Sequence, residues 1–252
     1  MKDIEALLNE LKGYGAIGLR ADMSSEICTK EELLCFKGLS LRAGFNLTVK
    51  VGGCDAITDI YFAKQSGAQN LITPMCETPY SVEKFVNACK YVYQKLSDVN
   101  LYINIETVTS YNNLDSILSS PFMNYIKGIV LGRDDMAQSF DIPLDEINSV
   151  KMLEIVSDIA QKVCLSGKEF IIGGGIRPQA VSFLNEIQKI YLTKYETRRI
   201  IFGGNEILKS NSDVGIKKAV EFETMWLKYR NDNINPDLLN TEKRILELNL
   251  SL

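Results

Sequence analysis

The chain has 252 residues, of which 46% are hydrophobic and 24% are charged, and its formal net charge is −4. This length suits one α/β barrel or two smaller domains, and the apolar fraction is large enough for a sizeable core. The slightly acidic balance gives no reason to expect a nucleic acid or an anionic membrane as a partner. No apolar run is long enough to span a bilayer, and the N-terminal MKDIEALLNELK has the pattern of an amphipathic helix rather than of a signal peptide.

Histidine is absent from the chain. A Ser-His-Asp triad, a Cys-His dyad, a histidine-bound zinc and a histidine general base are therefore excluded within one subunit. Acid–base chemistry would fall to carboxylates, Lys, Tyr, Cys or metal-bound water. The six cysteines show no CxxC or zinc-site spacing, and several fall in strand or helix patterns. We therefore interpret them as reduced core residues of a cytoplasmic protein.

Helices and strands alternate through the first part of the chain. A capping box at Thr29–Glu32 opens one helix and Gly44 suits its end, while Thr78 and Pro79 suit the start of another. Helices are expected at residues 2–12, 29–44, 57–63 and 79–96, and strands at 16–21, 47–51 and 71–75.

The second part begins with a strand–helix–strand unit. Two short apolar runs, 101–105 and 128–131, are each followed by carboxylates, and a single helical pattern lies between them. Such a unit makes the two strands parallel neighbours. Further helices are expected at 150–163, 180–187 and from Val214, with a break near 233–236 and a resumption at Thr241, and strands at 170–172 and 199–202.

Seven strands, each followed by a helix, predict a parallel sheet with helices outside. Polar pairs recur at the carboxyl ends of the strands, which favours a (β/α)₈ TIM barrel over an open sheet. These pairs are Arg20 and Asp22, Thr48 and Lys50, Asn104 and Glu106, and Arg133 and Asp135. The unaccounted strand is short or is replaced by the N-terminal helix, so the first strand is atypical or missing. We expect residues 1–215 to form one catalytic barrel and residues 216–252 a C-terminal helical extension that packs on the barrel or on a neighbouring subunit.

Glu106 and Asp135 are the first candidates for a functional site. Side chains alternate along a strand, so Asn104 and Glu106 share one face. Because neighbouring strands lie about 5 Å apart, Glu106 and Asp135 can meet at one edge of the sheet. Two adjacent carboxylates are costly unless a cation binds there, and oxygen ligands suit Mg²⁺ or Mn²⁺. The alternative is a pair of ordinary solvated carboxylates at loop starts.

Three segments, in this order, resemble the HpcH/HpaI aldolase and citrate lyase family, the metal-dependent pyruvate aldolases of the phosphoenolpyruvate/pyruvate barrel superfamily. They are SGAQNLITPMCET (66–78), INIET (103–107) followed by NNLDSIL (112–118), and GIVLGRDDM (128–136). The likeness covers roughly residues 17–140. It implies that Glu106 and Asp135 hold Mg²⁺ or Mn²⁺, and that pyruvate binds at the same site.

Two departures from the family concern the substrate and the base. The family's pyruvate-binding arginine appears here as Lys50, which offers a point charge instead of a bidentate fork. Lys50 has three interpretations: it binds the substrate carboxylate, forms a Schiff base, or pairs with Glu106 or Asp22. Arg20 complements the missing arginine or pairs structurally with Asp22. The family's base histidine is also missing, which leaves Asp22, Glu26 or a metal-bound hydroxide as open alternatives.

Other candidate substrate-binding residues lie on the loops after the strands. Gly132 and Arg133 precede the metal aspartate. The segment GGGIR (173–177), with Gly174 and Arg177, resembles a phosphate-binding turn and would favour a phosphorylated sugar or an acyl-CoA; the alternative is close packing. Trp226, near the C-terminus, is expected in the core or a subunit interface.

These observations predict a carbon–carbon lyase of the aldehyde-lyase or oxo-acid-lyase type. It would act on a 2-oxo acid aldol or a related acyl-CoA through a Mg²⁺-stabilised pyruvate enolate, with Lys50, Arg20 and Asp22 as catalytic residues. One alternative is a phosphoenolpyruvate-using transferase on the same metal, and another is a non-catalytic metabolite-binding barrel. We expect a cytoplasmic homo-oligomer with small-molecule substrates and neither nucleic acid nor membrane as partner.

Overall fold

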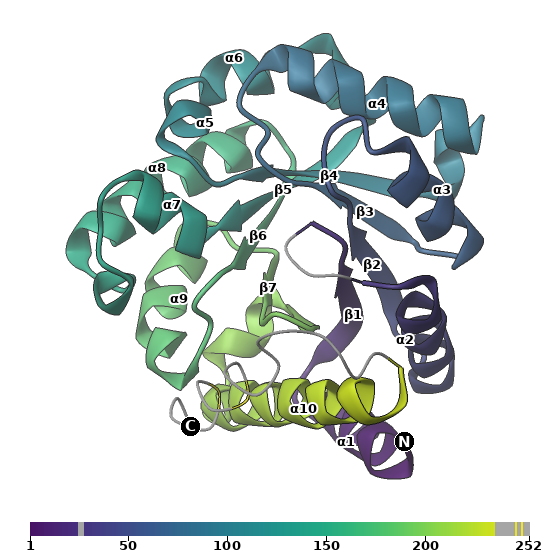
Figure 1. Ribbon diagram of the computed structural model, residues 1–252. Helices are drawn as coiled ribbons and strands as arrows, with labels where there is room; N and C mark the ends of the chain where they lie inside the picture. Colours follow the sequence, from purple (N-terminus) through teal and green to yellow (C-terminus); the bar gives the residue numbers. More distant parts are fainter. Residues whose placement is uncertain (25–27, 235–244, 246–247, 249–252) are drawn as a thin grey trace.

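Eight strands form a closed barrel in chain order, with helices around it (Figure 1). The computed structural model describes residues 1–24, 28–234, 245 and 248. The strands are β1 (Ala16–Asp22), β2 (Asn46–Lys50), β3 (Asn70–Thr73), β4 (Asn100–Ile105), β5 (Ile126–Gly132), β6 (Glu169–Gly173), β7 (Lys194–Glu196) and β8 (Ile200–Gly203). The predicted α/β class and TIM-barrel architecture are therefore confirmed.

Most of the predicted helices are present, and two begin with the caps that the sequence indicates. The helices are α1 (Lys2–Gly13), α2 (Lys30–Ala43), α3 (Ile57–Gln65), α4 (Pro79–Tyr93), α5 (Val108–Asn112), α6 (Leu114–Leu118), α7 (Arg133–Ser139), α8 (Val150–Leu165), α9 (Val181–Gln188) and α10 (Ser212–Asn233). The Thr29 side chain accepts a hydrogen bond from the Glu32 N–H at the start of α2, which satisfies a backbone donor that the helix leaves unpaired. Thr78 and Ser81 form a reciprocal capping box at the start of α4.

The barrel is irregular at its last strand. β1 to β7 are parallel to their neighbours, whereas β8 runs antiparallel to both β7 and β1. The turn at residues 197–199 joins β7 directly to β8, with the Thr197 N–H donating to the Ile200 carbonyl. The expectation that every strand precedes a helix is therefore wrong at β7. The strand that the sequence left unaccounted is the three-residue β7, and the first strand, β1, is present, with a register shift between Ala16 and Gly18 where it pairs with β8.

The prediction of a single helix between β4 and β5 is also wrong. Two short helices, α5 and α6, occupy that segment and meet at Asn113. The Asn113 side-chain amide donates to the Glu77 carbonyl at 2.9 Å, outside its own helix. This contact fixes the break because Asn competes readily for local hydrogen bonds instead of continuing a helix.

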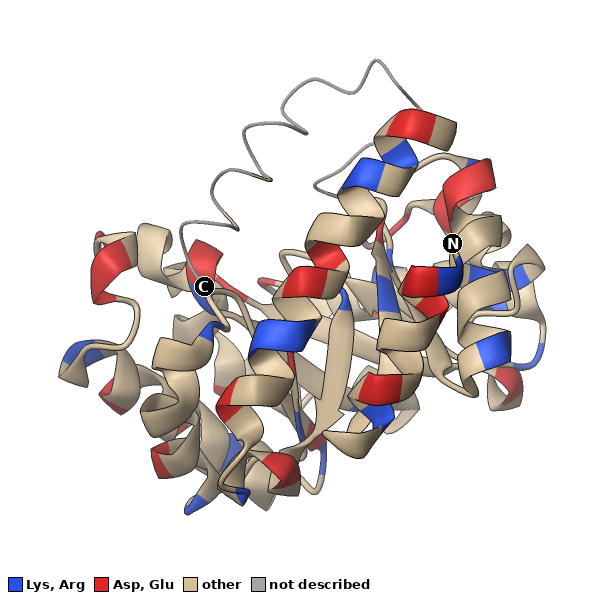
Figure 2. Ribbon diagram, turned by 90° about the horizontal axis from the view of Figure 1, so that it is seen from below, with Lys and Arg blue, Asp and Glu red and all other residues tan. Residues whose placement is uncertain are grey.

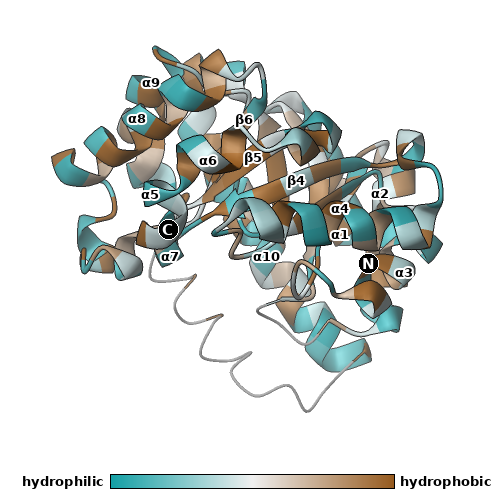
Figure 3. Ribbon diagram, turned by 90° about the horizontal axis from the view of Figure 1, so that it is seen from above, coloured by the Kyte–Doolittle hydropathy of each residue, from teal (hydrophilic) through white to brown (hydrophobic). Residues whose placement is uncertain are grey.

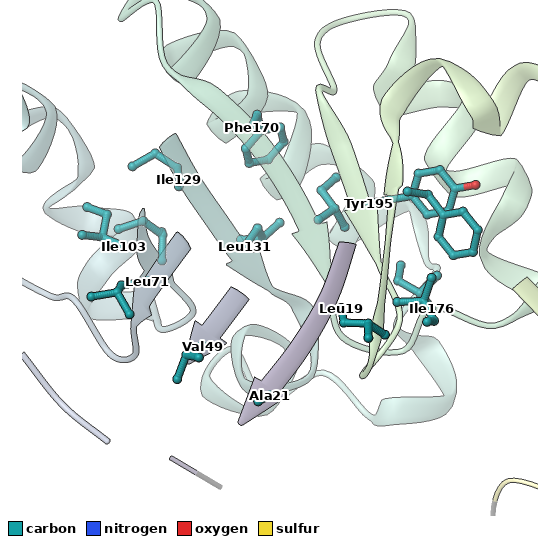
Figure 4. Packing of buried hydrophobic residues seen from close by; sticks show 14 of the residues in the cluster. Leu19, Ala21, Val49, Leu71, Ile103, Ile129, Leu131, Phe170, Ile176 and Tyr195 are labelled. Carbon is teal, nitrogen blue, oxygen red and sulfur yellow. The ribbon is translucent and has the colours of Figure 1, made fainter. Parts of the chain in front are cut away.

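The strands bury both of their faces. Leu71, Ile103, Ile129 and other outward-facing side chains pack against the helices (Figure 4). A second layer inside the barrel consists of Ile72, Tyr102, Val130 and Ile171. In Figure 3, β4 and β5 are mostly brown, whereas the helices mix brown and teal. Burying each such side chain contributes roughly 1.5–3 kcal/mol, so the barrel is a rigid support for groups at its carboxyl end.

The C-terminal helix α10 lies beside α1 on the outside of the barrel (Figure 1). Trp226 in α10 is fully buried, and its ring centroid lies 4.4 Å from that of Phe36 in α2. Its indole N–H donates to Glu32 at 3.2 Å. Trp226 is therefore a core residue, as the sequence predicts. The helix expected to resume at Thr241 falls in a segment that is almost entirely outside the described residues.

Charged residues of both signs are mixed over the helices (Figure 2), with no face of a single sign in the part of the chain shown there. None of the helices in the described part combines the length and the apolarity needed to cross a membrane. All six cysteines are described and none forms a disulfide. Cys76 and Cys89 are buried, but Cys164 is exposed, so the core interpretation fails for that residue.

Candidate functional site

A polar cavity of about 350 Å³ lies at the carboxyl ends of the parallel strands. The β7–β8 turn contributes to its wall. Four cationic side chains line it, Arg20, Lys50, Arg177 and Arg198. Five carboxylates line it as well, Asp22, Glu106, Asp134, Asp135 and Glu196. The position is the one at which barrels of this architecture carry their active sites.

Glu106 follows β4 directly and is almost completely buried. One carboxylate oxygen, Oε1, accepts a hydrogen bond from the Met75 N–H at 2.9 Å. The other, Oε2, accepts from the Asn104 amide at 2.6 Å and lies 3.5 Å from the Lys50 Nζ. Asn104 and Glu106 therefore share the cavity face, as strand alternation predicts. These contacts hold the Glu106 carboxylate in one orientation.

Asp135 lies in the first turn of α7, beside Glu106. Burial raises the pKa of Asp135, and the negative charge of Glu106 raises it further, while Lys50 acts in the opposite direction. Hydrogen bonding to the Glu106 carboxyl group acts in the same direction. The structure thus brings Glu106 and Asp135 together, as their strands indicated.

Gly132, at the end of β5, makes room for this pair. A Cβ on residue 132 would lie 2.3 Å from the Glu106 Oε2, far inside normal contact. Gly132 also lines the cavity, so a contact with substrate stays a prediction. Its observed role is to let the Glu106 carboxylate approach the backbone.

The carboxylate pair fits a hard divalent cation by its donor chemistry. Two neighbouring carboxylates, one buried and one half-buried, repel each other when both are charged, and a dication would relieve that repulsion. No cluster of three or more His, Cys, Asp or Glu residues suited to a metal occurs within the described residues. Glu106 and Asp135 would therefore supply two oxygen ligands, with water or substrate as the others, as is common for Mg²⁺.

Lys50 ends β2, opposite Asp22 in the register between β1 and β2. Its side chain is only 9% exposed, and its Nζ contacts the Glu106 carboxylate at 3.5 Å. The pairing with Glu106, one of the three interpretations of Lys50, is thus the observed contact. Binding of a substrate carboxylate and Schiff-base formation stay predictions.

Arg20 is held between two carboxylates. Its Nη2 donates to the Asp22 Oδ2 at 2.8 Å, and its Nη1 donates to the Glu196 Oε1. Burial opposes the charge, yet Glu196 and Asp22 keep the pKa of Arg20 above its ordinary value. The other Asp22 oxygen accepts from the Ser24 N–H and hydroxyl. The structural pair between Arg20 and Asp22 is therefore present, and Glu26, another candidate base, lies outside the described residues.

Arg133 does not share a face with Asp135, and that prediction is wrong. β5 ends at Gly132 and α7 starts at Arg133. Successive side chains from Arg133 on are therefore rotated around the helix axis instead of alternating between two faces of a strand. The Arg133 side chain is fully buried, lies 4.6 Å from the Phe183 ring centroid and does not line the cavity. Its guanidinium donates to the carbonyls of Gly174 and Gly175. Burial lowers the pKa of Arg133 to about 10, against the opposing charge of Asp134.

Gly174 and Arg177, the candidates for anion binding, both line the cavity. Gly174 has a φ of +79°, and a Cβ there would lie 2.6 Å from the Asp134 N–H nitrogen. Close packing, the alternative explanation for this glycine, is therefore observed. A role of the turn in binding stays a prediction.

Sequence reasoning missed Glu196 and Arg198. Both come from the β7–β8 hairpin, and Glu196 is fully buried beside Arg20. The polar–apolar–polar alternation of Lys194, Tyr195 and Glu196 was the available signal, although three residues are too few to identify a strand securely.

Comparison with known proteins identifies the fold and the family. The model of the HpcH/HpaI aldolase/citrate lyase family matches residues 43–172, just over half of the chain. A family protein from Burkholderia cenocepacia J2315 superposes with a TM-score of 0.61 and 15% identity, over 77% of this chain and 83% of that one. An HpcH/HpaI aldolase from Desulfitobacterium hafniense DCB-2 gives 0.58 and 13%, over 71% and 76%. The citrate synthase SbnG gives 0.59 and 18%, over 77% and 81%. The search of curated proteins finds no match. At these identities the solved structures establish the barrel fold, and the family model establishes the lineage: the chain belongs to the HpcH/HpaI aldolase/citrate lyase family.

Proposed function

We propose that the protein is a metal-dependent carbon–carbon lyase that acts on a 2-oxo acid aldol or a related acyl-CoA. Membership of the family supports an enzyme of the lyase type. The observation that carries the finer proposal is that the buried Glu106 and the half-buried Asp135 both line the cavity, close enough for the Glu106 charge to raise the pKa of Asp135. Lys50 offsets part of the negative charge of this pair, and a dication at the carboxyl end of the barrel would offset the rest.

The proposed roles follow from the contacts of each side chain. Glu106 and Asp135 would hold Mg²⁺ or Mn²⁺, which when bound supplies positive charge to stabilise negative charge on the 2-oxo acid. Asn104 and the Met75 N–H fix the orientation of Glu106. Lys50 binds the substrate carboxylate, which replaces its contact with Glu106.

In the proposed cleavage, the C3–C4 bond of a 4-hydroxy-2-oxo acid breaks and its electron pair remains on C3 as the pyruvate enolate. The C4 hydroxyl loses its proton as it becomes the aldehyde, and C3 takes up a proton to complete pyruvate. Asp22 already accepts hydrogen bonds on both oxygens, from Arg20 and from Ser24. We therefore assign Asp22 to positioning Arg20 at the cavity wall, and the hydroxyl proton to water in the cavity.

The test is the double variant Glu106→Gln, Asp135→Asn. We expect Mn²⁺ binding, followed by calorimetry, to be lost, and the pyruvate-dependent condensation with an aldehyde to fall by about 10²–10³-fold or more. Glu186→Gln is the control, since Glu186 is exposed on α9 and pairs with Lys189 alone. Condensation at the wild-type rate in a folded double variant would refute the proposal.

A Schiff-base lyase is the second candidate, because the Lys50 amine lies buried in the same cavity. Borohydride reduction in the presence of pyruvate separates the two mechanisms. The metal mechanism predicts no covalent adduct at Lys50, whereas a pyruvate adduct on that residue would favour the second candidate. Homo-oligomeric assembly and a cytoplasmic location stay predictions, testable by sedimentation and by cell fractionation.

A further inference from the structure

The turn after β6 has an unusual orientation of its peptide groups. Gly174 and Gly175 have φ values of +79° and +58°, a conformation that favours glycine. A Cβ on Gly175 would lie 2.8 Å from the Ile147 side chain, so both the conformation and the space require glycine there. The turn is thus held in one shape by its packing.

Arg133 determines which way the peptide groups of this turn face. The Gly174 carbonyl accepts from the Arg133 Nε and Nη2 at 3.1 and 2.9 Å, and the Gly175 carbonyl accepts from Nη2 at 3.1 Å. In a trans peptide the N–H points opposite to the carbonyl, and no peptide bond in the described chain is cis. The N–H groups of Gly175 and Ile176 therefore point away from the buried guanidinium.

The cavity lies on that opposite side. Gly175 and Ile176 line the cavity and Arg133 does not. Neither N–H donates to any protein atom in the described part of the chain. Gly175 is half-buried and Ile176 is buried, and these two successive N–H groups are available to an acceptor in the cavity. Successive N–H groups in a turn form a concave site that suits an anion.

The side chains around the turn add positive charge. Arg177 follows it directly, and Arg198 projects from the β7–β8 turn into the same cavity wall. Guanidinium groups bind phosphate oxygens in a bidentate manner. One carboxylate opposes this arrangement, since the Asp134 Oδ1 would lie 3.2 Å from a Cβ on Gly175.

From this geometry we propose that the cavity contains an anion subsite, formed by the N–H groups of Gly175 and Ile176 with Arg177 and Arg198, that binds the phosphate of a phosphorylated aldehyde. The identification of the aldehyde as the second substrate rests on the lyase activity proposed above, but the subsite itself does not. Guanidinium groups and backbone N–H groups together suit the several oxygens of a phosphate monoester, which favours this anion.

The position of the subsite suits a short substrate. Gly173, just before the turn, pairs in register with Gly132, just before the helix that carries Asp135. Adjacent strands lie about 5 Å apart, so the turn is on the order of 5–10 Å from the carboxylate pair. A short-chain aldehyde with a terminal phosphate can place its carbonyl carbon near Glu106 and Asp135 while its phosphate contacts the turn.

The binding test uses glycolaldehyde phosphate and inorganic phosphate with the full chain in EDTA, so that it does not depend on a metal. We expect calorimetry to show binding that weakens at least tenfold in the Arg177→Gln, Arg198→Gln variant. Asp134→Asn should bind both probes more tightly, a gain that general damage to the fold would not produce. Arg42→Gln is the control, because Arg42 lies on the exposed part of α2.

A kinetic test separates this proposal from the lyase proposal. If condensation with pyruvate occurs, the preference in kcat/KM for glycolaldehyde phosphate over glycolaldehyde should fall at least tenfold in the double arginine variant. Phosphate binding without any condensation would leave the subsite standing and remove the lyase proposal. Phosphate binding that needs the metal and disappears in Glu106→Gln, Asp135→Asn would overturn the subsite. An equal or greater affinity for a carboxylated aldehyde would overturn the choice of phosphate, and an equal or greater affinity for coenzyme A would overturn the choice of a phosphorylated aldehyde.

Discussion

Replacement of Gly132 by alanine tests the central geometry of the site with a single methyl group. The backbone at residue 132 has a φ of −89° and a ψ of 96°, close to the extended region that alanine adopts without strain. The effect must therefore come from the new Cβ, which would lie 2.3 Å from the Glu106 Oε2.

The size of the effect follows from what surrounds Glu106. To restore ordinary contact, the carboxylate must move by about 1 Å, since normal contacts begin near 3.4 Å. The Met75 N–H, the Asn104 amide and burial all resist that movement. Overpacking of this kind costs about 1–3 kcal/mol in the free energy of unfolding. For a chain of this size, 2 kcal/mol lowers Tm by about 4–8 °C.

The assay measures stability and metal binding together. We expect Gly132→Ala to lower both the urea midpoint and the Mn²⁺ affinity, the latter by tenfold or more, because displacement of one carboxylate separates the pair. Gly203→Ala is the matched control, as its Cβ would find its nearest neighbour at 3.7 Å with an extended backbone.

A double-variant cycle gives the refuting outcome. In a Glu106→Ala background the added methyl group has room, so Gly132→Ala should cost little further stability. If Gly132→Ala is equally costly with and without the Glu106 side chain, or costs nothing in either case, the close approach of Glu106 to Gly132 is incorrect.

Three further predictions concern other parts of the molecule. Arg133→Lys should lower the free energy of unfolding by about 2–4 kcal/mol, because one ammonium cannot replace the donors to the Gly174 and Gly175 carbonyls; an unchanged urea midpoint would contradict this. Burial and the Glu106 charge raise the pKa of Asp135, so in metal-free protein its stabilising contribution is present below the ordinary carboxyl range and is lost as pH rises through the raised pKa. In EDTA, the stability of the Asp135→Asn variant relative to wild type should therefore increase from acidic to neutral pH. If the difference between their urea midpoints does not change with pH over that range, this prediction is contradicted. Trp226→Ala should lower the free energy of unfolding by about 3–5 kcal/mol, and Trp226→Phe should lower it less because packing on Phe36 is retained. If the two variants lower Tm equally, packing is not the main contribution of Trp226 to stability.

Glu106 could be identified from the sequence because strand alternation leaves little freedom. Ile103 and Ile105 pack outward in the main core, which forces Asn104 and Glu106 to the inside of the barrel. A slip of one residue would reverse every side chain of the strand, so the apolar pattern fixes the register. The position of Glu106 at the cavity, directly after β4, follows from that pattern, whereas its role as a metal ligand stays a prediction.

Arg133 was misplaced because its position depends on where a strand becomes a helix. Gly132 is the N-cap of α7 and provides no side-chain cap, so the sequence lacks the Ser, Thr, Asp or Asn signal that usually marks such a start. Extension of the strand pattern beyond Gly132 put Arg133 and Asp135 on one face. The helical turn instead directs Arg133 into the core and Asp135 into the cavity.

The β7–β8 hairpin was missed for a different reason. A local pattern gives the presence of a strand but not its direction, and the parallel order of β1 to β7 made an antiparallel partner unexpected. The connecting turn also lacks the Asn-Gly or Asp-Gly sequence that usually indicates a tight hairpin. Thr197 takes part instead, since its side chain accepts a hydrogen bond from the Ile200 N–H at 3.2 Å.

The reversed eighth strand also affects how the chain reaches its native state. β7 and β8 are close in sequence and can pair early, whereas the seam with β1 joins residues as distant as Gly18 and Ile201. Loop-closure entropy makes such distant pairing slow, so the seam is expected to form late in folding. The bond between Arg20 and Glu196 crosses the same seam. During synthesis on the ribosome, the barrel therefore acquires a complete binding cavity only after β8 has emerged.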